Sequence, residues 1–101
     1  MTPYIKLNSH GNDFILIDTN DTESNITVDD IIYYSRRDKI GCDQFFIINT
    51  EDKDNIYCEV YNQDGSKACQ CGNGLRATML YLNRKYNLLK ANLIVCDVCY
   101  E

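Results

Sequence analysis

The sequence predicts an α+β domain of hairpin-connected strands and two helices. Short apolar runs recur along the chain and are separated by polar turns, which is typical of strands joined by hairpins. Two longer segments instead carry apolar residues at helical spacing. The chain has 101 residues, 45% of them hydrophobic and 25% charged. This length and composition fit one domain with a single hydrophobic core.

The first half of the chain predicts a hairpin followed by a helix. Apolar runs at residues 4–7 and 14–18 flank a polar turn, and a polar loop follows the second run up to residue 25. Residues 27–37 predict a helix, because Thr27 can cap its start and Asp30 completes a capping box. Its predicted inner face carries Val28, Ile31, Ile32 and Ser35.

The second half predicts two strands, a helix and a final strand. Residues 44–48 and 56–61 form apolar runs around a charged turn, and residues 62–66 have the composition of a tight turn. Residues 72–86 predict a helix and residues 93–95 a last strand. The helix has an apolar stripe at positions i, i+4, i+7 and i+11, formed by Leu75, Met79, Leu82 and Tyr86.

Charge and hydropathy exclude several classes of partner. The formal net charge is −5, so no basic surface favours nucleic acid or an anionic membrane. No apolar run approaches the roughly 20 residues that a membrane-spanning helix needs. The first residues lack the charged and apolar regions of a secretory signal. We therefore expect a cytoplasmic protein that binds neither nucleic acid nor membrane.

Six cysteines are many for a chain of this length. An even number is compatible with disulfides, but disulfides need an oxidising compartment, and no export signal supports one. We therefore expect reduced thiols. A structural zinc site remains an alternative, because four of the cysteines form two closely spaced pairs: Cys69, Cys71, Cys96 and Cys99.

The segment around Cys71 combines the features of a reactive thiol. Cys71 comes directly before the predicted helix, where unpaired backbone N–H groups and the helix dipole stabilise a thiolate. The N–H groups of Gly72 and Asn73 could hold a carboxylate. A buried structural cysteine is the alternative. His10, the only histidine, is the one candidate for a Cys–His pair, but its polar turn favours a solvated imidazole.

Four segments, in this order, resemble the diaminopimelate epimerase family: residues 6–14, 41–44, 61–66 and 70–76. The stretch Gln-Cys-Gly-Asn-Gly at residues 70–74 is the most specific of them. The resemblance implies a mainly antiparallel sheet wrapped around a central helix, with a second helix. It also implies a cofactor-independent and metal-free isomerase that converts LL- to meso-diaminopimelate, a precursor of lysine and peptidoglycan.

The resemblance also assigns roles to individual residues. Cys71 matches the first of two catalytic cysteines, which face opposite sides of the substrate α-carbon. One takes the α-proton as a thiolate and the other returns a proton as a thiol. Gly72 and Asn73 match the amide donors beside this cysteine. Asn12, Gln44 and Asn62 match positions that contact the substrate.

The family's second catalytic cysteine lies in a second domain, which has no counterpart in this sequence. We therefore expect residues 1–101 to be a truncated N-terminal domain with an exposed sheet edge, inactive alone. The partners left open are a separately encoded C-terminal half and a second copy in a homodimer. The alternatives in function are a related racemase or isomerase, such as a proline racemase-like or phenazine-biosynthesis-like protein, and a non-catalytic cysteine-rich zinc or interaction module.

Overall fold

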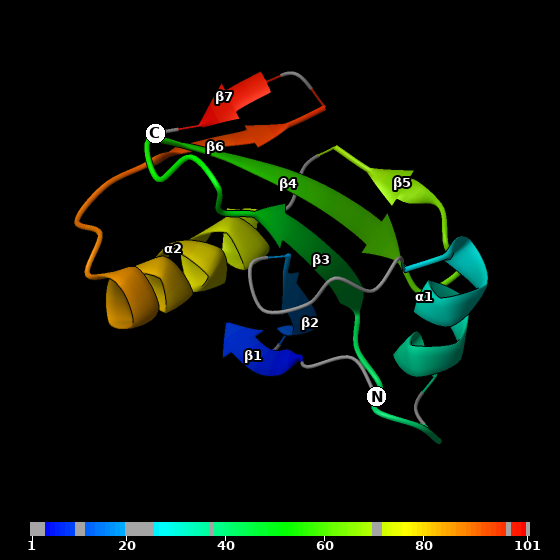
Figure 1. The fold of residues 1–101 in the computed structure, drawn as a ribbon. Helices are drawn as coiled ribbons and strands as arrows, with labels where there is room; N and C mark the ends of the chain where they lie inside the picture. Colours follow the sequence, from blue (N-terminus) through cyan, green and yellow to red (C-terminus); the bar gives the residue numbers. More distant parts are fainter. Residues whose placement is uncertain are drawn as a thin grey trace.

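One mixed sheet carries a helix on each face (Figure 1). The structure is a computed structural model and describes residues 4–9, 12–19, 26–36, 38–69, 72–96 and 98–100. Within these residues, the elements in chain order are β1 (Ile5–Ser9), β2 (Asn12–Asp18), α1 (Val28–Ser35), β3 (Gln44–Asn49), β4 (Asn55–Asn62), β5 (Lys67–Ala68), α2 (Gly72–Tyr86), β6 (Asn92–Val95) and β7 (Val98–Tyr100). Neither helix is long and apolar enough to cross a membrane.

The strand order is β1-β2-β3-β4-β6-β7, and β5 also pairs with β4. Strands β2 and β3 are parallel, as are β4 and β6, whereas the other pairs are antiparallel. The prediction of an α+β fold with a mainly antiparallel sheet is therefore confirmed. The two parallel pairs arise because α1 connects β2 to β3 and α2 lies between β4 and β6 in the chain.

The core has two layers because successive strand residues point to opposite faces. Phe14 and Leu16 of β2 pack in the cluster beneath α2, whereas Ile15 and Ile17 pack in the cluster beneath α1. The stripe predicted on α2 is confirmed. Leu82 is fully buried, and its three neighbours on the stripe pack against the same cluster.

The start of α1 is as predicted, because Thr27 and Asp30 form both hydrogen bonds of a capping box. Its predicted apolar face is divided. Ile31 and Ser35 are buried, but Val28 is 51% and Ile32 37% exposed. These two side chains lie over the turn at Gly65 instead of the sheet, as their distances of 2.7 and 3.0 Å from a Cβ built at Gly65 show.

Strands β5 and β7 were not predicted from the sequence. β5 has two residues and β7 three, so neither has room for the alternating pattern that identifies a strand. They are strands because they pair with β4 and β6, respectively. The predicted helix at residues 27–37 also ends earlier, because Arg36 is already extended.

Candidate functional site

Three predicted substrate-contacting residues lie at one end of the sheet. Asn12 begins β2, Gln44 begins β3 and Asn62 ends β4. The register places Gln44 between Phe14 of β2 and Asn62 of β4. These positions meet because β2 and β3 are parallel, whereas β4 runs the opposite way. The sheet thus gathers residues separated by 50 positions in the chain.

Gln44 and Asn62 form a direct amide pair at this end. The Nε2 of Gln44 donates to the Oδ1 of Asn62 at 3.3 Å, and the Nδ2 of Asn62 donates to the Oγ of Ser66 at 3.0 Å. The backbone N–H of Asn62 also donates to the carbonyl of Ser66 at 2.8 Å. Both amides are half-buried and oriented, and each kind of group can donate and accept. Asn12 is placed by its backbone, opposite Ser9.

Two aspartates that the sequence did not identify as functional fasten β2 to β3 beside this pair. The N–H of Asp13 donates to the Oδ2 of Asp43 at 3.0 Å, and the N–H of Asp43 donates to the Oδ1 of Asp13 at 3.1 Å. Lys6 lies 3.6 Å from Asp13 and offsets part of the negative charge. Each aspartate directly neighbours a predicted site residue in the chain, which is the signal that could have identified them.

The turn after β4 is tied to the same region. Gln63 donates from its Nε2 to the carbonyl of Cys42 at 2.7 Å, and Gly65 donates its N–H to the carbonyl of Asn62 at 3.0 Å. The turn therefore fixes the position of Asn62 relative to the start of β3.

Helix α2 begins close to this end of the sheet. Ala68 of β5 pairs with Val60 near the end of β4, and three peptide units join Cys69 to Gly72, a span of at most about 11 Å. The far end of α2 lies at the opposite end of β2, where Tyr86 donates from its hydroxyl to Asp18 at 2.5 Å. The N–H groups of the first turn of α2, which have no carbonyl partner within the helix, are thus on the side of the amide pair.

Gly72 and Asn73 are the first two residues of α2, as the sequence predicted for this helix. Cys71, Gln70 and His10 lie outside the described residues. Both the position of the Cys71 thiol beside Gly72 and its catalytic role therefore stay predictions. Its sequence position, one residue before the helix, is the position at which a helix dipole acts most strongly on a thiolate.

The expectation of reduced thiols is wrong for one pair, because Cys69 and Cys96 form a disulfide with Cα atoms 5.5 Å apart. The sequence could not reveal this, since the two cysteines meet only through pairing of β5 and β6 with the same strand. The disulfide also engages two of the four sulfurs that the zinc alternative requires. Cys42 and Cys58 are not part of a disulfide and are buried, and burial raises the pKa of Cys58 to about 12.

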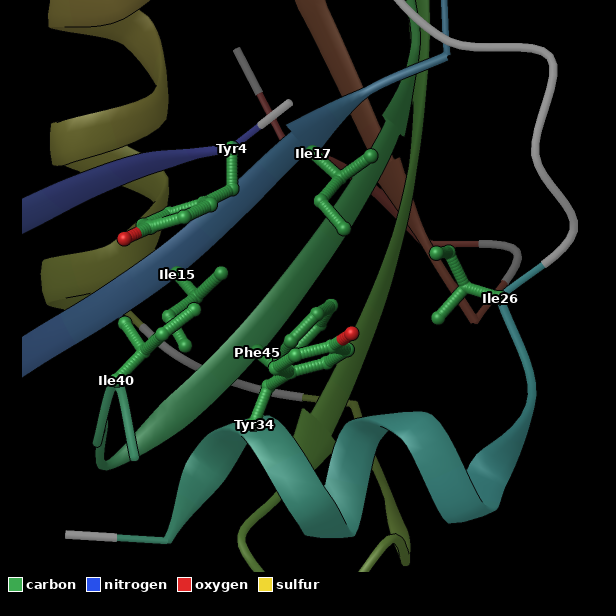
Figure 2. Close-up of a pocket in the computed structure, with 7 residues that line it drawn as sticks. All are labelled: Tyr4, Ile15, Ile17, Ile26, Tyr34, Ile40 and Phe45. Atoms are coloured by element: carbon green, nitrogen blue, oxygen red, sulfur yellow. The ribbon is translucent and has the colours of Figure 1, made fainter. Parts of the chain in front are cut away.

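A small apolar cavity lies elsewhere, between α1 and the sheet. Figure 2 shows its seven lining side chains pointing into the space between them: Tyr4, Ile15, Ile17, Ile26, Tyr34, Ile40 and Phe45. The cavity volume is only about 10 Å³. Binding pockets for small molecules are typically some 300–1,000 Å³ and combine apolar walls with polar groups. This cavity is therefore part of the core packing, not a substrate site.

Solved structures of the PhzF family share the fold. A phenazine biosynthesis protein of the PhzF family from Enterococcus faecalis aligns with a TM-score of 0.70 and 10% identity, over 95% of this chain and 37% of that one. The PhzF family protein from Bacillus anthracis aligns with a TM-score of 0.65 and 13% identity, over 95% of this chain and 33% of that one. At these identities the likeness concerns the fold alone.

Sequence comparisons are more specific. The chain is 36% identical over 80 residues to the diaminopimelate epimerase of Pelagibacter ubique, which covers 79% of this chain and 29% of the relative. It is 33% identical over 93 residues to that of Blochmanniella pennsylvanica, covering 89% of this chain and 34% of the relative. The chain thus spans about a third of the length of these relatives. The family model described as diaminopimelate epimerase matches residues 4–95, and the chain therefore belongs to the diaminopimelate epimerase family.

Proposed function

We propose that this chain is the N-terminal half of a cofactor-independent diaminopimelate epimerase that interconverts LL- and meso-diaminopimelate in the cytoplasm. The observation that carries the proposal is the convergence of Asn12, Gln44 and Asn62 at the sheet end next to the start of α2. In a member of this family, that arrangement supports a substrate site with Cys71 at its centre.

The chemistry of the substrate suits these groups. Diaminopimelate carries an ammonium and a carboxylate at each end, and the amides of Gln44 and Asn62 can accept from the first and donate to the second. When the α-proton leaves, negative charge spreads into the neighbouring carboxylate. The N–H groups of Gly72 and Asn73, at the positive end of the α2 dipole, would stabilise that charge.

Cys71 supplies one of the two proton-transfer groups in this proposal. As a thiolate it removes the α-proton from one face, and a second thiol returns a proton to the opposite face. Each direction of the reaction uses the two groups in reversed roles. The scheme needs neither a metal nor an organic cofactor.

The second thiol would come from a partner: a separately encoded C-terminal half or a second copy of the chain. An apolar groove of about 340 Å³ between β1 and α2 supports the need for a partner. Ile5 at its rim is 36% exposed and Leu80 is 50% exposed, although both are large apolar side chains. Among the described strands, β1 pairs on one side only, so it can accept another strand.

Titration of the chain with meso-diaminopimelate, followed by NMR chemical shifts, tests the site. Gln44→Ala and Asn62→Ala should each weaken binding about tenfold, because a hydrogen bond to a charged group contributes about 1.5 kcal/mol or more. Asn83→Ala is the matched control, since Asn83 is exposed in the second half of α2 and bonds to Leu88. Equal affinity in all three variants, or no binding to the unaltered chain, would contradict the proposed site.

A further inference from the structure

Strands β5 and β6 meet end to end along one edge of β4, and a disulfide joins the residues that follow them. β6 runs parallel to the first half of β4 up to the pair Cys58–Val95, whereas β5 runs antiparallel along its second half up to the pair Val60–Ala68. Figure 1 shows β5 and β6 pointing toward each other. Cys69 follows one tip and Cys96 the other, and their sulfurs are bonded across the gap.

The backbone at Cys96 indicates that its sulfur has a role. Cys96 begins the two-residue connection between β6 and β7 and has φ +49°. Hairpins with two-residue loops favour asparagine or glycine at such positions, because other side chains are strained there. A cysteine is unfavourable for this backbone, and the bond to Cys69 is an interaction that asparagine could not make.

The disulfide is open to solvent, in contrast to the buried thiols of Cys42 and Cys58. Cys69 is exposed and Cys96 half-buried, whereas Cys42 and Cys58 are buried. Thiol–disulfide exchange needs direct access to sulfur. A soluble thiol can therefore attack this bond, while the two buried cysteines are protected from the same reagent.

The bond also holds one end of α2. Cys69 lies three residues before Gly72, so the disulfide tethers the start of α2 to the end of β6 through at most about 11 Å of chain. The other end is held independently, by hydrogen bonds from Tyr81 and Tyr86 to Asp18. Opening the disulfide would therefore release the start of α2 and leave its last turns in place.

We propose that Cys69 and Cys96 form a redox-responsive clamp that orders the first turn of α2. In the closing reaction, the two thiols react with one molecule of a low-molecular-weight disulfide. Its sulfur–sulfur bond breaks, the Cys69–Cys96 bond forms, and two small thiols leave with the two thiol protons. Two electrons pass from the protein to the reagent, and an excess of the small thiol reverses every step.

Hydrogen exchange on the full chain tests the clamp. The protein is equilibrated in glutathione buffers ranging from fully reduced to fully oxidised, and amide exchange is followed by mass spectrometry. Reduction should speed exchange about tenfold or more in the first turns of α2, around Leu75 and Arg76, and leave the turn at Arg84 unchanged. Equal exchange at Leu75 in both states, or an equal change at Arg84, would overturn the proposal.

Cys96→Asn is the matched variant, because asparagine suits the positive φ and replaces the thiol with an amide that cannot form a disulfide. It should exchange like the reduced protein in every buffer. Peptide mapping without reductant should find Cys69 joined to Cys96 in the unaltered chain. The clamp would also be overturned if Cys96 were bonded to another cysteine. The same holds if Cys69 and Cys96 stayed fully oxidised or fully reduced in every buffer.

The effect on ligand binding rests on the proposed function. Diaminopimelate should bind at least threefold more tightly to the oxidised chain than to the reduced chain. Equal affinity in the two states would overturn the link between clamp and site. Absence of binding in both states would refute the proposed function, while the exchange experiment would still decide on the clamp.

Discussion

At the scale of single residues, Asp18 at the end of β2 is the acceptor that joins several side chains in one buried network. It is 3% exposed, and it accepts hydrogen bonds from Thr50 at 2.7 Å, Tyr81 at 2.8 Å and Tyr86 at 2.5 Å. Lys85 lies 3.6 Å away and supplies a positive charge. Burial and the hydrogen bond to Asp18 raise the pKa of Tyr81, so its hydroxyl keeps its proton and remains a donor.

Asp18→Asn should therefore destabilise the protein strongly. An amide has one acceptor oxygen in place of two and carries no charge. Hydroxyl groups that donate to Asp18 would therefore lose an acceptor, and the ammonium group of Lys85 would lose its negative partner. We expect the free energy of unfolding to fall by about 3 kcal/mol, measured by urea denaturation. Asp54→Asn, at an exposed position, should change it by less than about 0.5 kcal/mol. A similar loss for both variants would show that the network is not responsible.

Thiol reactivity gives a second prediction at this scale. If Cys71 precedes the start of α2 as proposed, the helix dipole lowers its thiol pKa, and it should react with iodoacetamide fastest among the reduced cysteines near pH 7. Cys58 should react slowly, because burial raises its pKa to about 12 and blocks access. Mass spectrometry of peptides from the pretreated, reduced protein measures each rate. Equal rates for Cys71 and exposed Cys69 would contradict the placement.

At the scale of elements, the turn after β4 and helix α1 depend on each other at Gly65. This residue has φ +84°, and an added Cβ would lie 2.7 Å from Val28 of α1. Gly65→Ala should cost about 2 kcal/mol in unfolding free energy, from the left-handed backbone and the clash together. Adding Val28→Ala should recover part of the loss, because it removes the nearest atom. If the double variant is no more stable than Gly65→Ala, the clash is not the cause.

The sequence predicts an element well when the interactions that form it join residues close together in the chain. Helix α2 has the predicted bounds, because its apolar stripe runs through 12 of its 15 residues. The start of α1 follows from Thr27 and Asp30, three positions apart. β5 and β7 depend on pairing with distant strands and leave no pattern of their own. The same is true of the parallel pairs, which are set by how the whole chain winds.

Some features of the candidate site are likewise predictable from the sequence, whereas others depend on the fold. The sequence motifs identify Gln44 and Asn62, and the sheet register places them in contact. The reciprocal bonds of Asp13 and Asp43 could not be derived, because neither residue belongs to a local motif with that geometry. The disulfide depends on two strand tips meeting beside β4, so no local sequence pattern predicts it.

At the scale of the whole molecule, α2 connects the two ends of the sheet. Its last turn is anchored in the network of Asp18, and its first residue, Gly72, follows the disulfide-bonded Cys69 by three positions in the chain. A site that relies on the first N–H groups of this helix therefore depends on contacts at both ends. The apolar groove between β1 and α2 indicates that the proposed partner would contact the same helix.

The last prediction concerns catalysis by the isolated chain. The proposed mechanism needs a thiol on each face of the α-carbon, and this chain spans about a third of the length of its relatives. Alone, it should bind diaminopimelate without inverting it. Incubation in deuterated water followed by NMR and chiral chromatography measures exchange and inversion separately.

Adding the remaining C-terminal part of the Pelagibacter ubique relative, produced as a separate chain, should restore inversion, and Cys71→Ala should abolish that gain. Inversion by the isolated chain would show that one thiol or a second copy suffices, and the need for a separate half would be refuted.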